Sequence, residues 1–564
     1  MANGTPNILL AAALLLPPLG TAAAQAPASP PAPAAMPRAR GAPTFTQRAA
    51  RRASFDDPAA QKAIDAGLRW LLGHQDADGR WSTANFSRHD PADRPSGGPG
   101  NPIHDVGTTS LCVLALLAQA DPRYDAAVTR AADWLFTQLQ ANGCVPFNAH
   151  DYIYSQALLT LALAEATALL GAASHREAAV RALAYLESHR NPGAAWRYMP
   201  RDADNDSSVT SWCLAAYAAA RDAELTVPTS SVAEALLWLD RTTTPDGYCG
   251  YSKLGESSAR RAGDHAKRFP VDAGTGLTGA ALHARLVHGV AAKDSLVTAA
   301  HELLQRKAPS AAPTARDFYS WCHASLAVGV LTANGVRSRW EAALRKTLLG
   351  LQCKDGSVAG SWHPDDAFGE DGGRVVATAL NVLSLSAPYR QGRHDAAGTI
   401  PTDPALQPIA AAWRADQLGT VATALSRLDV STLGPAAAAA VPRLRWLLEL
   451  EIALVTSKTA ALRSDAAAGP ELEAHLARVE ARFRGSATGT AAADELAQLR
   501  RDPARRREAE AATALAELQT EREALRKKPN AARQRQLRSQ LAKFAERYDG
   551  TRAARTALEL LTGL

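Results

Sequence analysis

A short segment, Gln75-Asp-Ala-Asp-Gly79-Arg-Trp81, recurs in degenerate form along this chain and constrains the fold more than any other feature. It follows an apolar run with the spacing of a helix, from Ile64 to Leu72. Glycine tolerates the left-handed conformation in which many helices end, and a tryptophan can pack back over the helix that precedes it. The recurring glycines, 64, 50 and 54 residues apart and then two steps on, are Gly79, Gly143, Gly193, Gly247 and Gly356. Such a period indicates a repeat architecture.

The element Gln-x-x-x-Gly-x-Trp, matched by Gln75, Gly79 and Trp81, resembles the repeat of prenyltransferases and squalene cyclases. The resemblance covers about residues 56–390 and implies an all-α fold, an α6/α6 toroid with six outer helices around six inner ones and a central cavity. Two segments, from Ala195 to Trp212 and from Gly360 to Leu380, more closely resemble secreted bacterial repeat proteins of this superfamily whose activity is unsettled.

The apolar pattern between 56 and 390 predicts alternating outer and inner helices. We expect the outer helices near residues 59–75, 124–141, 175–190, 230–243, 293–307 and 338–353. We expect the inner helices, which are more uniformly apolar, near 105–120, 151–170, 206–224, 272–290, 317–333 and 374–388. Two long connections, 82–104 and 249–271, are candidate lids or binding loops.

Residues 1–26 resemble a secretory signal peptide, with an apolar core from Ile8 to Leu19 and small residues at 22–26. The core is short and contains Pro17-Pro18, which disfavours a membrane-spanning helix, and we find no other segment apolar enough to span a bilayer. We therefore expect an exported protein, periplasmic or extracellular, that is not an integral membrane protein. The Pro/Ala-rich stretch 27–55 is expected to be a linker.

The character of the chain changes after the predicted toroid. Residues 391–408 are interpreted as a linker, and 409–564 as a helical domain built like a tetratricopeptide array, because segments beginning at Arg482 and Arg547 share an aromatic residue, a turn glycine and small residues that open a helix. This array is a candidate surface for a protein partner. Its arginines alternate with Glu and Gln, and a formal charge of +6 is spread over 564 residues, so no nucleic-acid partner is expected.

Acidic residues stand near the start of most inner helices. Asp105, Asp206 and Asp272 each precede an equivalent helical position by seven residues, and Arg374 occupies the same place in the sixth helix. Aspartate at this place is a good helix cap, but in a toroid it also lines the mouth of the cavity, where pKa values are displaced. The candidate catalytic residues are Asp105, Asp206 and Asp272. The candidate ligand-binding residues are His104, Arg197, Trp212, Trp321 and Arg374.

The resemblance implies two chemistries, and the sequence departs from both. Cyclases that begin by protonation carry Asp-x-Asp-Asp before an inner helix, but alignment on Asp206 places Asn205 where the acid stands, and an amide is not a strong acid. Protein prenyltransferases hold zinc through Asp-x-Cys, which does not occur here. His363 and Asp365 are as consistent with a turn as with a metal site, so we expect no metal. No Gly-rich phosphate loop occurs either, and no cofactor is expected.

Six cysteines lie within the predicted toroid. Three occupy equivalent places in inner helices and are expected to pack in the core: Cys112, Cys213 and Cys322. The three near the ends of outer helices are better disulfide candidates, with the pairing left open: Cys144, Cys249 and Cys353.

Two functions of different classes remain. The first is an exported protein that binds a hydrophobic or polymeric ligand in the central cavity, without cyclase or prenyltransferase chemistry. The second is an enzyme, terpenoid cyclase-like or a polysaccharide-active lyase or hydrolase, that uses the acidic rim; carboxylates flanking a cleft suit glycoside chemistry, although this link is one of fold analogy. The loss of both catalytic motifs from a chain that keeps the structural repeat favours binding.

Overall fold

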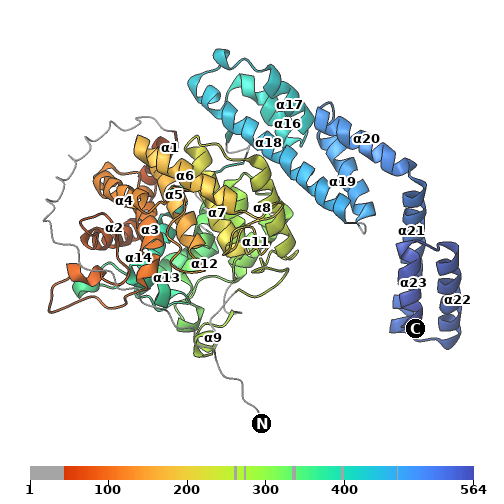
Figure 1. Cartoon of the computed structure of the whole chain (residues 1–564), viewed down its shortest axis with the longest axis horizontal. Helices are drawn as coiled ribbons and strands as arrows, with labels where there is room; N and C mark the ends of the chain where they lie inside the picture. Colours follow the sequence, from red (N-terminus) through yellow and green to blue (C-terminus); the bar gives the residue numbers. More distant parts are fainter. Residues whose placement is uncertain are drawn as a thin grey trace, which may run out of the picture. The chain divides into compact units, whose positions relative to one another are not determined.

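The computed structural model describes residues 43–258, 263–271, 275–332, 338–395, 399–465 and 468–563. Within these residues the regular elements are helices, together with two isolated β-bridges (Figure 1). The predicted signal peptide, the linker up to residue 42 and the candidate Asp272 lie outside the described residues. The all-α class expected from the sequence is confirmed.

Six inner helices form a closed ring, because each contacts the next and the last one returns to the first. In chain order they are α3 (Asp105–Leu117), α5 (Ile153–Leu170), α7 (Ser207–Asp222), α10 (Thr278–Val287), α12 (Phe318–Leu331) and α14 (Gly369–Arg390). Every residue of α3 is buried, as expected for a helix enclosed on all sides. The predicted inner helices are confirmed to within a few residues at most ends.

Six outer helices alternate with the inner ones along the chain and pack against them from outside. They are α2 (Pro58–Gly73), α4 (Asp125–Thr137), α6 (Ala173–His189), α8 (Thr229–Thr242), α11 (Ser295–Arg306) and α13 (Arg339–Leu351). Because each inner helix follows an outer one, all inner helices run in the same direction. We call the end of the ring at which they begin the front, and the end at which they finish the rear.

The tryptophans of the recurring segment join three of the outer helices to the inner helices that follow them. Trp81, Trp196 and Trp362 are fully buried. Their indole N–H groups donate to carbonyl oxygens near the ends of the preceding outer helices, those of Leu71 at 2.7 Å, Leu186 at 2.8 Å and Leu348 at 2.9 Å. Their backbone N–H groups donate to threonines of the following inner helices, Thr109, Thr210 and Thr378.

Three glycines of the segment, Gly79, Gly143 and Gly247, allow a close approach to the next outer helix, whereas the space around Gly193 is open. Gly79 has φ +99°, and a Cβ atom there would lie 2.2 Å from the carbonyl oxygen of Arg130. In the last repeat this role belongs to Gly360, where a Cβ would lie 2.4 Å from the carbonyl oxygen of Ala66. Gly356 has the expected positive φ of +67°, but Gly360 and not Gly356 makes the close approach. Gly360 precedes Trp362 by two residues, as Gly79 precedes Trp81.

The end of the range 27–55 is a helix and not a linker. Helix α1 (Pro43–Ala53) packs on α14 and α5. Its Arg48 is 3% exposed, forms an ion pair with Glu165 at 3.1 Å and donates to the carbonyl oxygens of Leu117 and Arg390. The apolar pattern could not predict this helix, because the side chain that it buries against the ring is an arginine, Arg48.

Beyond the ring, further helices pack against their neighbours in the chain. Their bounds are α16 (Gln407–Arg414), α17 (Leu418–Arg427), α18 (Pro435–Ser464), α19 (Gly469–Arg482), α20 (Ala487–Arg501), α21 (Pro503–Lys527), α22 (Ala531–Arg547) and α23 (Arg552–Thr562). Gly485 and Gly550, at φ +81° and +83°, lie in the turns of α19–α20 and α22–α23, as their sequence similarity predicted. α18 also packs along α8 of the ring.

The connections contain short elements, namely η1 (Phe86–His89), η2 (Pro102–His104), η3 (Pro122–Tyr124), α9 (Asp264–Arg268), η5 (Pro313–Ala315), η6 (Gly356–Val358), η7 (Pro404–Leu406) and η8 (Val430–Thr432). Among the described helices, α5 alone has the length and apolarity of a membrane span, and 83% of it is buried inside the ring. All six cysteines are free thiols, so the predicted disulfide candidates Cys144, Cys249 and Cys353 are unpaired.

Candidate functional site

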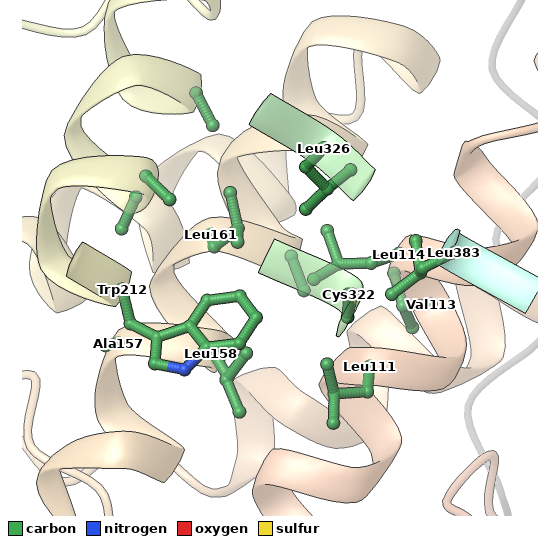
Figure 2. Close-up of a cluster of buried hydrophobic side chains, with 14 of the residues drawn as sticks. Leu111, Val113, Leu114, Ala157, Leu158, Leu161, Trp212, Cys322, Leu326 and Leu383 are labelled. Atoms are coloured by element: carbon green, nitrogen blue, oxygen red, sulfur yellow. The ribbon is translucent and has the colours of Figure 1, made fainter. Parts of the chain in front are cut away.

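The ring encloses two chambers, one at each end. The front chamber has a volume of about 300 Å³ and the rear chamber about 1030 Å³. Trp212 of α7 lines both, so it belongs to the floor that separates them. Figure 2 shows the buried cluster around this floor, with Trp212 beside Leu158 and Leu161.

His323 is part of the same floor. Its ring lies 4.3 Å from that of Trp212 and 4.9 Å from that of Tyr319, measured between centroids. Burial lowers the pKa of His323 to about 3, so the imidazole is neutral at ordinary pH. Neither ring nitrogen has a hydrogen-bond partner among the described residues. The floor is therefore apolar in character although it contains a histidine.

The front chamber has an apolar wall and a polar rim. The wall includes Leu111, Leu158, Trp212, Leu277, Val376 and Leu380. Four tyrosines and a phenylalanine also line it: Tyr154, Tyr198, Tyr251, Tyr319 and Phe368. The rim adds His104, Asp151, Asp366 and Asp371. Of the residues predicted from the sequence, His104 and Trp212 line this chamber.

Asp206 lies directly behind the tyrosines. It caps α7 by accepting the N–H of Val209 at 2.7 Å, and the Tyr251 hydroxyl approaches its other oxygen at 3.4 Å. The Arg197 Nε stands 3.7 Å away, close enough for an ion pair but without a hydrogen bond. Burial raises the pKa of Asp206 to about 7 despite Arg197 and the hydrogen bonds. Asp206 is thus both a cap and a carboxyl that holds its proton near neutral pH.

Asp105 and Arg374 hold the loop 82–104 against the ring. Asp105 accepts the backbone N–H and the hydroxyl of Thr83 at 2.8 and 2.6 Å. Arg374 donates to the carbonyl oxygen of Gly97 at 2.6 Å, to the Ser361 hydroxyl at 3.0 Å and to the His363 ring at 2.8 Å. Neither side chain lines the front chamber.

The remaining predicted residues are dispersed. Trp321 is 7% exposed and packs against Phe318, with ring centroids 5.6 Å apart, and it lines neither chamber. His363 contacts Arg374, and Asp365 forms an ion pair with Arg316, so the two do not face a common ion. In the described part of the chain, no group of three or more His, Cys, Asp or Glu side chains is placed to hold a metal.

Sequence reasoning missed Asp366. This carboxyl lines the front chamber, is 6% exposed and accepts the N–H of Phe318 at 3.1 Å. Burial and the neighbouring Asp317 raise its pKa to about 7. The sequence pattern did not indicate Asp366, because this residue lies three positions before α14 and outside the register shared by Asp105, Asp206 and Arg374.

Several exposed apolar side chains lie at the front of the ring. Most of the exposed large hydrophobic residues lie in connections that lead from an outer helix to an inner one. They are Ile103, Phe147, Met199, Leu254 and Phe368. Each of the five belongs to a different connection at the front of the ring.

No protein-family model matches the chain, and no curated protein is detectably similar to it. The chain is similar in structure to the type II terpene cyclase MstE from Scytonema. The apo enzyme is 18% identical with a TM-score of 0.39, over 59% of this chain and 98% of that one. An MstE variant bound to its substrate geranylgeranyl dihydroxybenzoate is 17% identical with a TM-score of 0.38, over 62% and 99% of the two chains.

Proposed function

We propose that this protein is an exported ligand-binding protein whose toroid, of the terpenoid cyclase and prenyltransferase type, takes a compact hydrophobic ligand in the front chamber. The observation that carries the proposal is the lining of that chamber, an apolar wall closed by Trp212 and rimmed by phenol and carboxyl groups. Ligand pockets are commonly about 300–1,000 Å³, mostly apolar and supplied with a few polar groups that fix orientation.

The floor around Trp212 favours a compact ligand over a polymer. A polymer threading the ring would have to pass the packed side chains of Figure 2. Tyr198 and Tyr251, whose hydroxyls are 2.8 Å apart, offer hydrogen bonds to a polar substituent at the outer end of the ligand. The exposed apolar residues of the front rim would give a hydrophobic ligand a path into the chamber.

The side chain of Asn205 supports binding without cyclase chemistry. Its Oδ1 accepts the backbone N–H of Ala195 at 2.9 Å and the Nδ2 of Asn191 at 3.1 Å. It is thus engaged in the turn before α7. An amide in this position stabilises the turn and supplies no acid.

The test uses the full chain and a neutral fluorescent probe, N-phenyl-1-naphthylamine. Val376 faces the front chamber from α14, so Val376→Trp should fill it and weaken probe binding at least tenfold. Val180→Trp is the matched control, because Val180 is 48% exposed on α6. Both variants should keep the wild-type unfolding midpoint to within a few degrees. Equal probe binding by all three proteins would exclude the front chamber as the site.

A second candidate function, acid catalysis, is favoured by Asp366. A carboxyl with a pKa of about 7 beside an apolar chamber can donate a proton at neutral pH to a group bound there. A ligand co-purifying with the protein would then be chemically changed on incubation with wild-type protein, and Asp366→Asn would stop this change while still binding the ligand. Mass spectrometry of the extracted ligand before and after incubation decides between binding and catalysis.

Export and a partner for α19–α23 complete the proposal. Export predicts that the mature protein begins after one of the small residues at 22–26, which N-terminal sequencing of the protein from the producing cell can establish. The paired helices beyond the ring offer surfaces for a protein partner. Removing residues 468–564 should leave probe binding by the front chamber unchanged.

A further inference from the structure

The rear chamber differs from the front one in what closes it. Its inner half is apolar, lined by Trp212 and by Leu114, Leu161, Ala215, Leu326 and Leu383. Its outer half is covered by α1 and by α18, which lie outside the repeats of the ring. Three residues of α18 that line it are Pro442, Arg443 and Trp446. Two segments that flank the ring in the sequence, one before it and one after it, thus complete a cavity that the ring alone leaves open.

Arginine is the most frequent charged residue in the lining of the rear chamber. Six arginines line the rear chamber: Arg48, Arg51, Arg221, Arg390, Arg393 and Arg443. Three carboxylates line it: Glu165, Asp222 and Glu224. Arg393 is paired with Asp395, which does not line the chamber. Six guanidinium groups against these four carboxylates leave an excess of two positive charges around the rear chamber.

Helix capping explains part of this charge. The inner helices end at the rear, where their last carbonyl groups lack partners and carry partial negative charge. Arg390 donates to the carbonyl oxygen of Leu114 at 3.3 Å, and Arg221 donates to that of Val287 at 3.1 Å. Arg221 is also bonded to Asp222 at 2.7 Å, and Arg390 to Glu165 at 2.5 Å. These two arginines therefore have structural roles.

Capping accounts for only one side of Arg443. Its Nη2 donates to the carbonyl oxygens of His394 at 3.0 Å and of Val287, the last residue of α10, at 3.4 Å. Its Nη1 is buried and has no hydrogen-bond partner in the described chain. Arg390 and His394 also line the chamber, and the Nε of Arg390 and the Nε2 of His394 are likewise buried without a hydrogen-bond partner among the described residues. Burial and the nearby Arg221 lower the pKa of Arg443 well below its ordinary value. A buried guanidinium with an open donor is costly unless an acceptor meets it.

The aromatic ring of Trp446 fixes the position of this charge. The guanidinium carbons of Arg221 and Arg443 lie 4.7 and 5.0 Å from its centroid. Both groups also donate to the carbonyl oxygen of Val287, at 3.1 and 3.4 Å, so they lie close enough together for a single anion to meet both. The nearby Asp222 serves Arg221 and leaves the Nη1 of Arg443 open.

We infer that the rear chamber binds an anionic amphiphile, with its acidic head at Arg443 and Arg221 and its apolar chain among the leucines that extend to Trp212. The head is a carboxylate or a phosphate, since both accept paired N–H donors. The apolar inner half disfavours an anion without a chain, because polar groups placed there would lose their hydrogen bonds. This second site is separate from the one proposed in the front chamber, and either can fail without the other.

The first experiment varies the ligand and needs no mutation. The full chain, delipidated, is titrated with 11-(dansylamino)undecanoic acid, and the bound probe is displaced with palmitate, hexadecyl phosphate or methyl palmitate. Palmitate or hexadecyl phosphate should displace the probe at least tenfold more effectively than the neutral ester, and the more effective of the two identifies the head group. Equal displacement by the ester, or absence of probe binding, would overturn the inference.

The second experiment locates the head group. Arg443→Gln should weaken binding of the dansyl acid at least tenfold, whereas Arg445→Gln, an exposed neighbour on α18, should leave it unchanged. Both variants should bind N-phenyl-1-naphthylamine as the wild type does, which shows that the ring is intact and keeps this outcome apart from any failure of the front site. Equal binding of the acid by the two variants would contradict the inference, as would a loss confined to Arg445→Gln.

Discussion

The front and the rear of one ring of helices carry opposite chemistry. At the front, where the inner helices begin, aspartates accept free N–H groups: Asp206 caps α7 and Asp317 caps α12. At the rear, where the helices finish, arginines such as Arg48 and Arg390 donate to carbonyl oxygens in the last turn of α3, those of Leu117 and Leu114. The parallel direction of the inner helices and their dipoles thus determine the sign of charge at each end.

The two ends also differ in how their charges are compensated. At the front, Asp206 and Asp366 have pKa values raised to about 7 by burial, so these carboxyls can become neutral. At the rear, burial would raise the pKa of Asp222, but Arg221, His394 and Arg443 outweigh it and lower the value to about 2. Buried carboxyls at the front therefore avoid an uncompensated charge by binding protons, whereas buried charges at the rear are compensated by ion pairs.

The largest effect is expected from breaking the rear ion pairs. Glu165 stands between Arg48 at 3.1 Å and Arg390 at 2.5 Å, and it is 6% exposed. Glu165→Gln keeps the shape but leaves two buried guanidinium groups without a counter-charge, which should cost about 3–5 kcal/mol of unfolding free energy. Denaturant midpoints measure this loss. Glu177→Gln on the exposed face of α6 is the control, and equal midpoints for the two variants would show that the rear is not held by charge.

The next effect concerns the loop that covers the front. Arg374→Gln removes charge-assisted hydrogen bonds to the loop and its neighbours, each worth about 1.5–3 kcal/mol when the donor is charged. The loop 82–104 should then open, and limited proteolysis should cut it faster. Arg94→Gln in the same loop serves as control because Arg94 is exposed. An unchanged cleavage rate in Arg374→Gln would mean that other contacts suffice to close the front.

The pH dependence of stability should separate the two ends. A carboxyl whose folded pKa is raised favours the folded state at low pH, so Asp206 and Asp366 make stability fall as pH rises from about 4 to about 7. His283, at the rear, has its pKa lowered to about 4 by burial and Arg390, so its contribution is lost as pH falls below about 6.5.

Variants make these two contributions visible. Asp366→Asn should remove a negative slope of at most about 1.4 kcal/mol per pH unit, and His283→Gln should remove a positive slope of similar limit. Unfolding free energies between pH 4 and pH 7 give the profiles. A profile of Asp366→Asn that is parallel to the wild type would show that this carboxyl is ionised in the folded protein.

The ring could be predicted from the sequence because its determinants are local. Trp81 and Gly79 are close in sequence to the helix that they end, and the apolar period marks each helix. The rear chamber could not be predicted, because its contacts are distant: Arg48 donates to a carbonyl oxygen 342 residues away. Asp366 was missed for a related reason, since its burial depends on the folding of α12 against α14.

The candidate site was predicted only in part, because the sequence does not show in which direction each side chain points in the folded ring. The spacing placed Asp105, Asp206 and Arg374 correctly near the starts of inner helices. It did not show which side of each helix faces the cavity, and Asp105 and Arg374 point to the loop 82–104. The helical period fixes the angle about the helix axis between side chains of one helix. The rotation of the whole helix relative to the cavity depends on how it packs against its neighbours.

The smallest effect is expected at Asp105, and it tests whether the front tolerates loss of charge. Both hydrogen bonds from Thr83 reach the same carboxyl oxygen, and the amide oxygen of Asn can accept them equally well. Asp105→Asn then loses mainly its interaction with the helix dipole, about 0.3–1 kcal/mol, because Arg80 is 4.0 Å away and about one-third exposed, so this ion pair is weak. Asp105→Ala leaves the Thr83 backbone N–H unpaired, whereas the hydroxyl can still donate to the carbonyl oxygen of Asn101 at 2.8 Å, and the change should cost about 1–3 kcal/mol. Should Asp105→Asn prove as destabilising as Asp105→Ala, the front would rely on charge as the rear does. A loss of probe binding at unchanged stability would instead place Asp105 among the residues that serve the ligand.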